Sequence, residues 1–159
     1  IDNVLATTDL SAPARHAAER AARLAAGIGA RLHLIHVLGL TPLDKLRRLV
    51  TPLPQEMEQR VVDAAAEDME ELAETLRLHH DLSPDVRVAS GPLLAEIARC
   101  ADEVEAGLIV LGARGASFMR HLLLGSTADR MVSRATRPMA SLTDFRKSSR
   151  FRVSKVTSL

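Results

Sequence analysis

Short apolar runs alternate with longer amphipathic stretches along most of the chain. The runs typical of strands are Asn3–Thr8, Arg31–Leu38, Asp85–Ser90 and Leu108–Leu111, with a further extended segment after Pro138. Between them, apolar residues recur every three or four positions, as in helices that pack on one face. Such alternation predicts parallel strands joined by right-handed crossovers. The chain is therefore expected to form one α/β domain, with a doubly wound parallel sheet and helices on both faces.

Helix boundaries are marked by residues that favour helix ends. Ser11 is a suitable N-cap for a first helix, which we expect to stop around Gly27 and Gly29. A third helix is expected after Pro92. The last helix is expected to begin at Ser126, whose hydroxyl can accept a hydrogen bond from the first turn.

The second helix is the clearest one in the sequence and runs from Gln55 to about His79. It combines one apolar stripe with acidic residues on the other faces, so it is expected to lie on the sheet with its acidic side in water. The predicted stripe consists of Val61, Ala65, Met69, Leu72 and Leu76. Residues 39–54, which precede this helix, contain three prolines and receive no predicted fold.

A glycine-containing loop follows the last apolar run. The pattern is Gly112-x-x-Gly115-x9-Gly125-Ser126, between the expected strand and the expected helix. Glycines leave no side chain between backbone N–H groups and an anion, and a helix N-terminus adds partial positive charge. The loop therefore suits a phosphate, although an ordinary strand-to-helix connection with Ser126 as N-cap has the same pattern. It matches neither the P-loop nor the dinucleotide fingerprint.

This spacing resembles the ATP-binding signature of the universal stress protein family, and the resemblance covers residues 3–143. It implies a five-stranded parallel sheet in the order 3-2-1-4-5. The order then reverses between the first and fourth strands, which end at Asp9 and Gly112. Ligands of open α/β sheets bind at such a reversal. The segment 138–143 is less apolar than the fifth strand usual in the family, through which members dimerise.

The resemblance also implies which residues form the site. Asp9 matches the acidic position that contacts the nucleoside, with Thr7 and Thr8 beside it, and Val37 matches the residue whose backbone meets the adenine. An alternative for Asp9 is an acid that favours the start of the next helix. The positions that match the ribose- and phosphate-binding loop, with the strand end before it, are Leu111, Gly112, Arg114, Gly115, Gly125, Ser126 and Thr127.

We therefore expect a stress-response regulatory protein that binds ATP, or AMP or ADP in its place, with Mg²⁺ at the phosphates. The alternatives are an interaction module of the same fold with an empty site, and a slow ATPase. No nucleophile and base stand at a recognisable spacing, so a binder is favoured over an enzyme. Histidines such as His33 and His36, three apart on a strand, face opposite ways and predict no metal site.

Composition excludes several other classes. No apolar stretch approaches the roughly 20 residues that span a bilayer. Aromatic residues make up 2% of the chain, which argues against nucleic-acid binding by base stacking. Cys100 is the one cysteine and no signal-like segment begins the sequence, so a reducing cytoplasm is expected.

The C-terminal segment differs in charge from the rest. Residues 146–159 hold five of the 21 basic residues and no acid, so acids exceed bases over residues 1–145. We expect a nucleotide-binding domain over 1–145 and a basic tail over 146–159. The tail is either a solvated end or, through the alternating Phe151 and Val153, an edge strand or a contact in a homodimer. The sequence does not identify a further protein partner.

Overall fold

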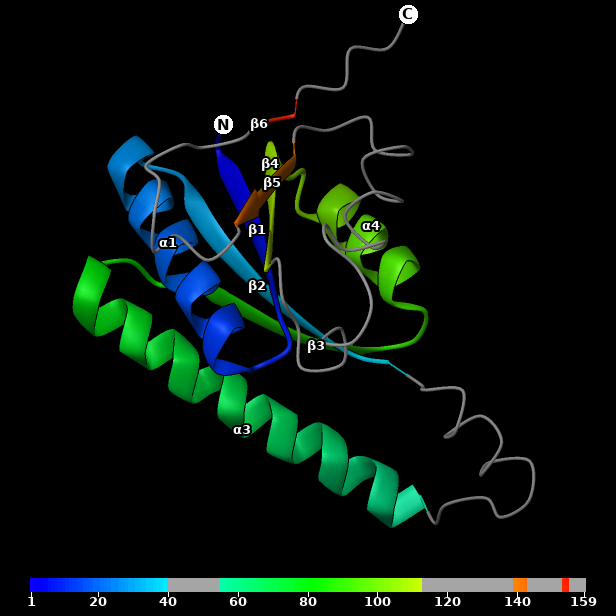
Figure 1. The fold of residues 1–159 in the computed structure, drawn as a ribbon. Coiled ribbons are helices and arrows are strands. Elements are labelled where there is room, and N and C mark those ends of the chain that lie inside the picture. Colours follow the sequence, from blue (N-terminus) through cyan, green and yellow to red (C-terminus); the bar gives the residue numbers. More distant parts are fainter. Residues whose placement is uncertain (40–54, 113–138, 143–152, 155–159) are drawn as a thin grey trace, which may run out of the picture.

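The computed structural model describes residues 1–39, 55–112, 139–142 and 153–154 (Figure 1). The strands are β1 (Asn3–Thr8), β2 (Arg31–Leu38), β3 (Asp85–Ser90), β4 (Leu108–Gly112), β5 (Met139–Leu142) and β6 (Val153–Ser154). The helices are α1 (Ala12–Ile28), α3 (Gln55–His80) and α4 (Leu93–Glu103). These bounds agree closely with the ranges expected from the sequence. The helix predicted after Ser126 lies outside the described residues.

The strands form one sheet in the order β3-β2-β1-β4-β5-β6. The predicted α/β domain with parallel strands is confirmed, and four strands of five to eight residues run in the order 3-2-1-4. The prediction of a five-stranded, wholly parallel sheet is wrong. In the described residues, the sheet continues beyond β4 through the four-residue β5 and the two-residue β6, and β6 runs antiparallel to β5.

The physical reason for this difference lies in the sequence of the last strands. Residues 138–143 contain a proline, an alanine and a serine, which are poor strand formers, so β5 is short. The edge that β5 leaves open pairs with the tail, where Val153 lies opposite Ala140. One of the two alternatives for the tail, an edge strand that includes Val153, is thus present, while Phe151 lies outside the described residues.

Helix α1 forms where capping residues permit it. The Ser11 side chain accepts the N–H of Ala14 at 3.4 Å, and Gly29 ends the helix in the left-handed conformation with φ of 68°. Just after this cap, the Ala30 N–H donates to the Ala25 carbonyl at 2.9 Å. These caps set the two ends of α1, which connects β1 to β2 in the chain.

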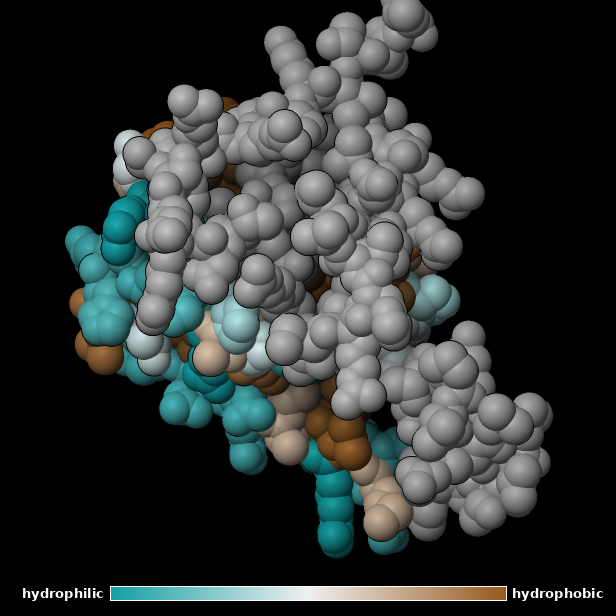
Figure 2. Space-filling model, in the orientation of Figure 1, coloured by the Kyte–Doolittle hydropathy of each residue, from teal (hydrophilic) through white to brown (hydrophobic). Residues whose placement is uncertain are grey.

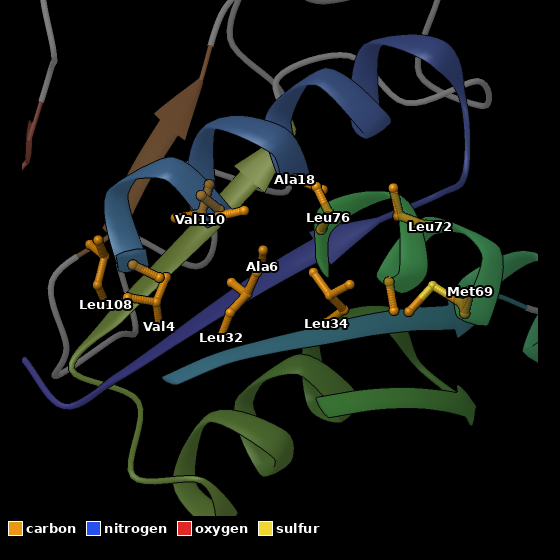
Figure 3. Packing of buried hydrophobic residues seen from close by; sticks show 14 residues of the cluster. Val4, Ala6, Ala18, Leu32, Leu34, Met69, Leu72, Leu76, Leu108 and Val110 are labelled. Atoms are coloured by element: carbon orange, nitrogen blue, oxygen red, sulfur yellow. The ribbon is translucent and has the colours of Figure 1, made fainter. Parts of the chain in front are cut away.

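Helices α1 and α3 cover one face of the sheet, and their contact is the main core that Figure 3 shows. Even-numbered residues of the strands point into this face, because side chains alternate along a strand. The buried members are Val4, Ala6, Ala18, Ala21, Ala22, Ala25, Leu32, Leu34, Met69, Leu72, Ala73, Leu76, Leu108 and Val110.

Helix α4 packs on the opposite face, against the odd-numbered strand residues (Figure 1). The buried members of this second cluster are Leu5, Ile35, Ala89, Ile97, Cys100, Ala101, Ala106, Ile109 and Leu111. Helices therefore cover both faces, as predicted. β1 lies between β2 and β4 in the middle of the sheet, so its side chains are buried on both faces.

The apolar stripe of α3 is shorter than predicted. Ala65, Met69, Leu72 and Leu76 are buried, but Val61 is 57% exposed and the prediction is wrong there. This first part of α3 lies at the end of the helix away from α1, so its apolar side has less of the core to cover (Figure 1). Hydrophilic side chains with a few apolar ones form the outward surface of this region in Figure 2.

In the described residues, no helix has the length and apolar character of a membrane span.

Candidate functional site

The sheet reverses its order at β1. The chain passes from β1 to β2 on one side, and β4 pairs with β1 on the other side. Pairing of β1 with β2 continues to the last residue of β1, where Thr8 lies opposite His36. Pairing of β1 with β4 runs from Val4–Leu108 to Ala6–Val110, so it stops before either strand ends. The two strands therefore part at their carboxyl ends, as expected of a ligand-binding reversal.

The structure places the described part of the predicted site along this edge of the sheet. Thr7 and Thr8 end β1, Asp9 follows them, and Val37 directly precedes Leu38, the last residue of β2. Leu111 and Gly112 end β4. Because the strands are parallel, all these positions lie at the same edge. The remaining predicted residues, Arg114, Gly115, Gly125, Ser126 and Thr127, lie outside the described residues.

These side chains differ in their burial. Thr8 is 6% exposed and Leu111 is 5% exposed, so both lie inside the fold. Val37 is partly buried against the cluster under α4. Thr7 and Asp9 are partly exposed, and they are therefore the described polar residues of the set that a ligand can reach directly.

Hydrogen bonds hold the turn between β1 and α1, which spans Thr8–Ser11. The Thr8 hydroxyl accepts the Leu10 N–H at 3.0 Å. The Asp9 carboxylate accepts the N–H of Ser11 at 3.1 Å and its hydroxyl at 2.5 Å, as in an Asx turn. Asp9 thus has a structural role in the turn that precedes α1, and its contact with a nucleoside stays a prediction.

Leu10 gives this turn its unusual backbone. Its φ is +63°, in the left-handed region, which costs a residue with a side chain about 1–2 kcal/mol. The Arg15 guanidinium donates from Nε to the Leu10 carbonyl at 3.3 Å, and Leu10 also packs against the core under α1. The surrounding contacts therefore stabilise a conformation that the turn does not favour by itself.

His36 is a residue of this region that sequence reasoning missed. Its Nδ1 lies 2.8 Å from the carbonyl oxygen of Thr8. We expected only a structural histidine on one face of β2. The signal that points to the contact is the position of His36 directly opposite Thr8, which requires knowledge of the strand register.

The described part of the site offers hydrogen-bonding groups on a fixed turn, which suits the binding of a polar ligand. In the described ranges, no group of three or more His, Cys, Asp or Glu residues is placed to hold a metal ion. The charges and backbone donors nearest to a phosphate are predicted in 113–138, outside those ranges.

Comparison with known proteins reveals a family match over most of the chain. Residues 1–141 match the universal stress protein family. A curated relative, universal stress protein A homolog 1 of Coxiella burnetii, is 28% identical over 134 residues, which is 84% of this chain and 90% of the relative.

Solved structures share the fold at lower identity. A universal stress protein in complex with cAMP is 20% identical and aligns with a TM-score of 0.66 over 89% of this chain and 95% of that one. The universal stress protein from Archaeoglobus fulgidus in complex with dAMP is also 20% identical, with a TM-score of 0.59 over 90% of this chain and 98% of that one.

Proposed function

The chain belongs to the universal stress protein family, and from this we propose that it is a stress-response regulatory protein that binds an adenine nucleotide between the carboxyl ends of β1 and β4. The observation that carries the proposal is the parting of β1 from β4 beyond Ala6 and Val110, next to the ordered turn Thr8–Ser11. Relatives of the same fold in complex with cAMP and dAMP support an adenine nucleotide as the ligand.

Within this proposal, the nucleotide is ATP, or AMP or ADP in its place, and Mg²⁺ accompanies the phosphates. We propose that Thr7, Thr8, Asp9 and the backbone of Val37 form the nucleoside end of the site, with Thr7 and Asp9 facing the ligand and Thr8 buried beside them. The ribose and phosphates then meet the loop that begins at Leu111 and Gly112. Its further members are Arg114, Gly115, Gly125, Ser126 and Thr127. The glycines of this pattern leave the backbone N–H groups open to phosphate oxygens.

A thermal shift measurement tests nucleotide binding directly. A ligand that binds only the folded state adds about 2.7 kcal/mol at about 100 times its Kd, or about 5–10 °C in Tm for a domain of this size. ATP with Mg²⁺ is expected to raise Tm more than adenosine at equal concentration. If millimolar ATP, dAMP and cAMP all leave Tm unchanged, the site is empty and the interaction module is the better description.

Substitution of loop glycines tests where the phosphates lie. Gly115→Val or Gly125→Val places a branched side chain where the backbone approaches the anion, so ATP binding is expected to fall by at least tenfold. Gly27→Val is the matched control, because a Cβ added at Gly27 meets nothing within 4 Å. Equal ATP affinity in all three variants, by calorimetry, would exclude the loop as the phosphate site.

The role of Asp9 requires a control for its bonds within the turn. Asp9→Ala is expected to weaken adenosine and ATP alike, whereas Ser126→Ala weakens mainly ATP. Ser11→Ala removes the hydroxyl that donates to Asp9 but keeps the Asp9 carboxylate. Competition titrations then separate the two roles of Asp9. A loss of affinity in Ser11→Ala as large as that in Asp9→Ala would mean that Asp9 acts only through the turn.

The oligomeric state of the protein belongs to the same proposal. We propose a cytoplasmic homodimer formed by a domain over 1–145, with the basic tail 146–159 contributing to assembly. Pairing of β6 in the tail with β5 supports a role of the tail at this sheet edge. Deletion of 146–159 is expected to weaken the dimer in light scattering across a concentration series. The same mass for both proteins at every concentration would leave the tail without a part in assembly.

A further inference from the structure

We propose that His36 is a positioning residue for the turn Thr8–Ser11. The Nδ1–H of its imidazole donates a hydrogen bond to the Thr8 carbonyl and thereby fixes this turn for nucleotide binding. This inference rests on the proposed function for its ligand. The contact that carries it is the 2.8 Å approach of His36 Nδ1 to the Thr8 oxygen. It joins β2 to the end of β1, so it acts between strands rather than within the turn.

The partner atom determines the tautomer of His36. A backbone carbonyl only accepts hydrogen bonds, so Nδ1 must carry the proton. Thr8 is 6% exposed, and a buried carbonyl without a donor is costly. The imidazole supplies a donor to this carbonyl at Thr8, the last residue of β1 that pairs with β2.

The hydrogen bond also orients the backbone that follows. The peptide unit between Thr8 and Asp9 is planar and trans, so its oxygen and its N–H point in opposite directions. When the oxygen is held toward His36, the Asp9 N–H is directed away from it. The plane of this peptide then sets the direction in which the chain enters Leu10, whose φ of +63° is the strained point of the turn.

The hydrogen bonds named above within the turn are local, and they involve groups other than the Thr8 carbonyl. The Thr8 hydroxyl holds the Leu10 N–H, and the Asp9 carboxylate holds Ser11. The Arg15 guanidinium holds the Leu10 carbonyl. All of these partners lie between residues 8 and 15 of the chain, whereas His36 comes from the neighbouring strand. The imidazole therefore links the turn to the neighbouring strand of the sheet.

Two conservative substitutions separate positioning from simple packing. In His36→Asn the side-chain N–H₂ lies near the position of Nδ1, whereas in His36→Gln it lies near the position of Nε2. We expect Asn to keep the affinity for ATP within about twofold, and Gln and Leu to lower it about five- to tenfold, as for the loss of one hydrogen bond. His16→Leu, at an exposed position of α1, is the matched control and leaves the affinity unchanged.

A measurement without nucleotide tests the same inference. Long-range ¹⁵N–¹H spectra of the imidazole are expected to show His36 with its proton on Nδ1. Amide exchange at Leu10 is expected to be about five- to tenfold faster in His36→Leu and His36→Gln than in the parent and in His36→Asn. Circular dichroism confirms that each variant is folded.

The outcomes distinguish the two proposals. Absence of ATP, dAMP and cAMP binding in the parent protein would overturn the proposed function, and the tautomer and the Leu10 exchange would still decide the structural part of this inference. A proton on Nε2 alone would overturn the positioning role even if ATP binds. Equal affinity in the Asn, Gln and Leu variants would also overturn it.

Discussion

The two faces of the sheet are stabilised in different ways. Under α1 and α3, four buried alanines of α1 meet leucines and a methionine from the strands and α3. Small side chains let the α1 backbone approach the sheet closely, so this face depends on tight apolar packing. On the other face, Ile97, Cys100 and Ala101 of α4 fill the core, and charged groups border it. The same substitution should therefore have different consequences on the two faces.

The charged border of the α4 face joins a strand to a helix. Arg87 of β3 pairs with Glu103 of α4, and Arg99 donates to the same Glu103 carboxylate at 2.7 Å. Arg99 also bonds Glu96 at 2.5 Å. On the face of α1 and α3, His80 lies 2.8 Å from the Glu19 carboxylate. Ionic contacts at such exposed positions are weak, so they align α4 more than they stabilise it.

The largest effect is expected from a cavity under α3. Leu76 is fully buried, and Leu76→Ala is expected to lower the free energy of unfolding by about 2–5 kcal/mol. Leu78→Ala is the matched control on the same helix, because Leu78 is 76% exposed and its loss is expected to cost less than about 0.5 kcal/mol. Urea denaturation measures both. Equal losses would contradict the assignment of the α3 core face.

A second, smaller effect is expected from overpacking on the same face. Ala18 is fully buried, and Ala18→Leu is expected to cost about 1–3 kcal/mol because α1 lies too close to the sheet for a larger side chain. Ala26→Leu, at an exposed position of α1, provides the control. If Ala18→Leu is as stable as the parent, the close approach of α1 is not what fills this face.

The strand limits were predictable from the sequence because they depend on local patterns. The apolar runs and the caps at Ser11 and Gly29 are read within a few residues, and β1, β2 and β3 begin and end where these patterns indicate. Val61 shows the limit of the approach. A helical period identifies one side of α3, but how far that side is covered depends on the extent of the sheet, which no local pattern contains.

The candidate site was predictable only in part for the same reason. Residues at strand ends, such as Gly112 in β4 and Asp9 directly after β1, were placed at one edge because a parallel sheet brings its carboxyl ends together. The contact of His36 with Thr8 depends on the register of β2 against β1, and the pairing of β6 with β5 depends on chain segments far apart. The strand register behind the His36 contact is non-local, so composition and periodicity carry no signal for it. The alternation of Phe151 and Val153 indicated an edge strand in the tail but not the strand that it pairs with.

A third prediction sharpens the contrast through the charged border. Glu103→Gln removes the partner of Arg87 and Arg99, so it is expected to destabilise the protein by less than either core substitution and to lose its effect at high salt. The hydrogen bond from Arg87 lowers the pKa of Glu103 from its ordinary 4.5. The contribution of ionised Glu103 to stability is therefore complete above pH 4.5 and is lost as the pH falls through the lowered pKa.

The control for Glu103 is a pair within one helix. Glu74 and Arg77 are three residues apart on α3, with a bond of 2.7 Å. Glu74→Gln breaks a contact that joins no two elements and is expected to have the smaller effect in urea denaturation at low salt. A larger loss in Glu74→Gln than in Glu103→Gln would mean that the link from β3 to α4 has no special role.

The smallest effect on stability is expected from His33 of β2, whose side chain on the α4 face contacts residues of both neighbouring strands. His33 of β2 lies 3.2 Å from the Asn3 oxygen of β1 and 3.3 Å from the Asp85 carboxylate of β3. Burial lowers the pKa of His33 from 6.5, and Arg31 lowers it further, while Asp85 opposes both. The folded protein thus favours neutral His33 more than the unfolded chain does.

The sign of the pH dependence follows from this direction. Between the lowered pKa and pH 6.5, the unfolded chain binds the proton more readily. The stability contribution of His33 is therefore complete above pH 6.5 and decreases as the pH falls from 6.5 to the lowered value. Asp85→Asn removes the opposing charge and is expected to lower the pKa of His33 further, whereas Arg31→Gln is expected to raise it. Histidine titration by NMR measures both shifts, and His33→Gln shows how much of the stability loss below pH 6.5 belongs to this group. A pKa that rises in Asp85→Asn would contradict the role assigned to the carboxylate.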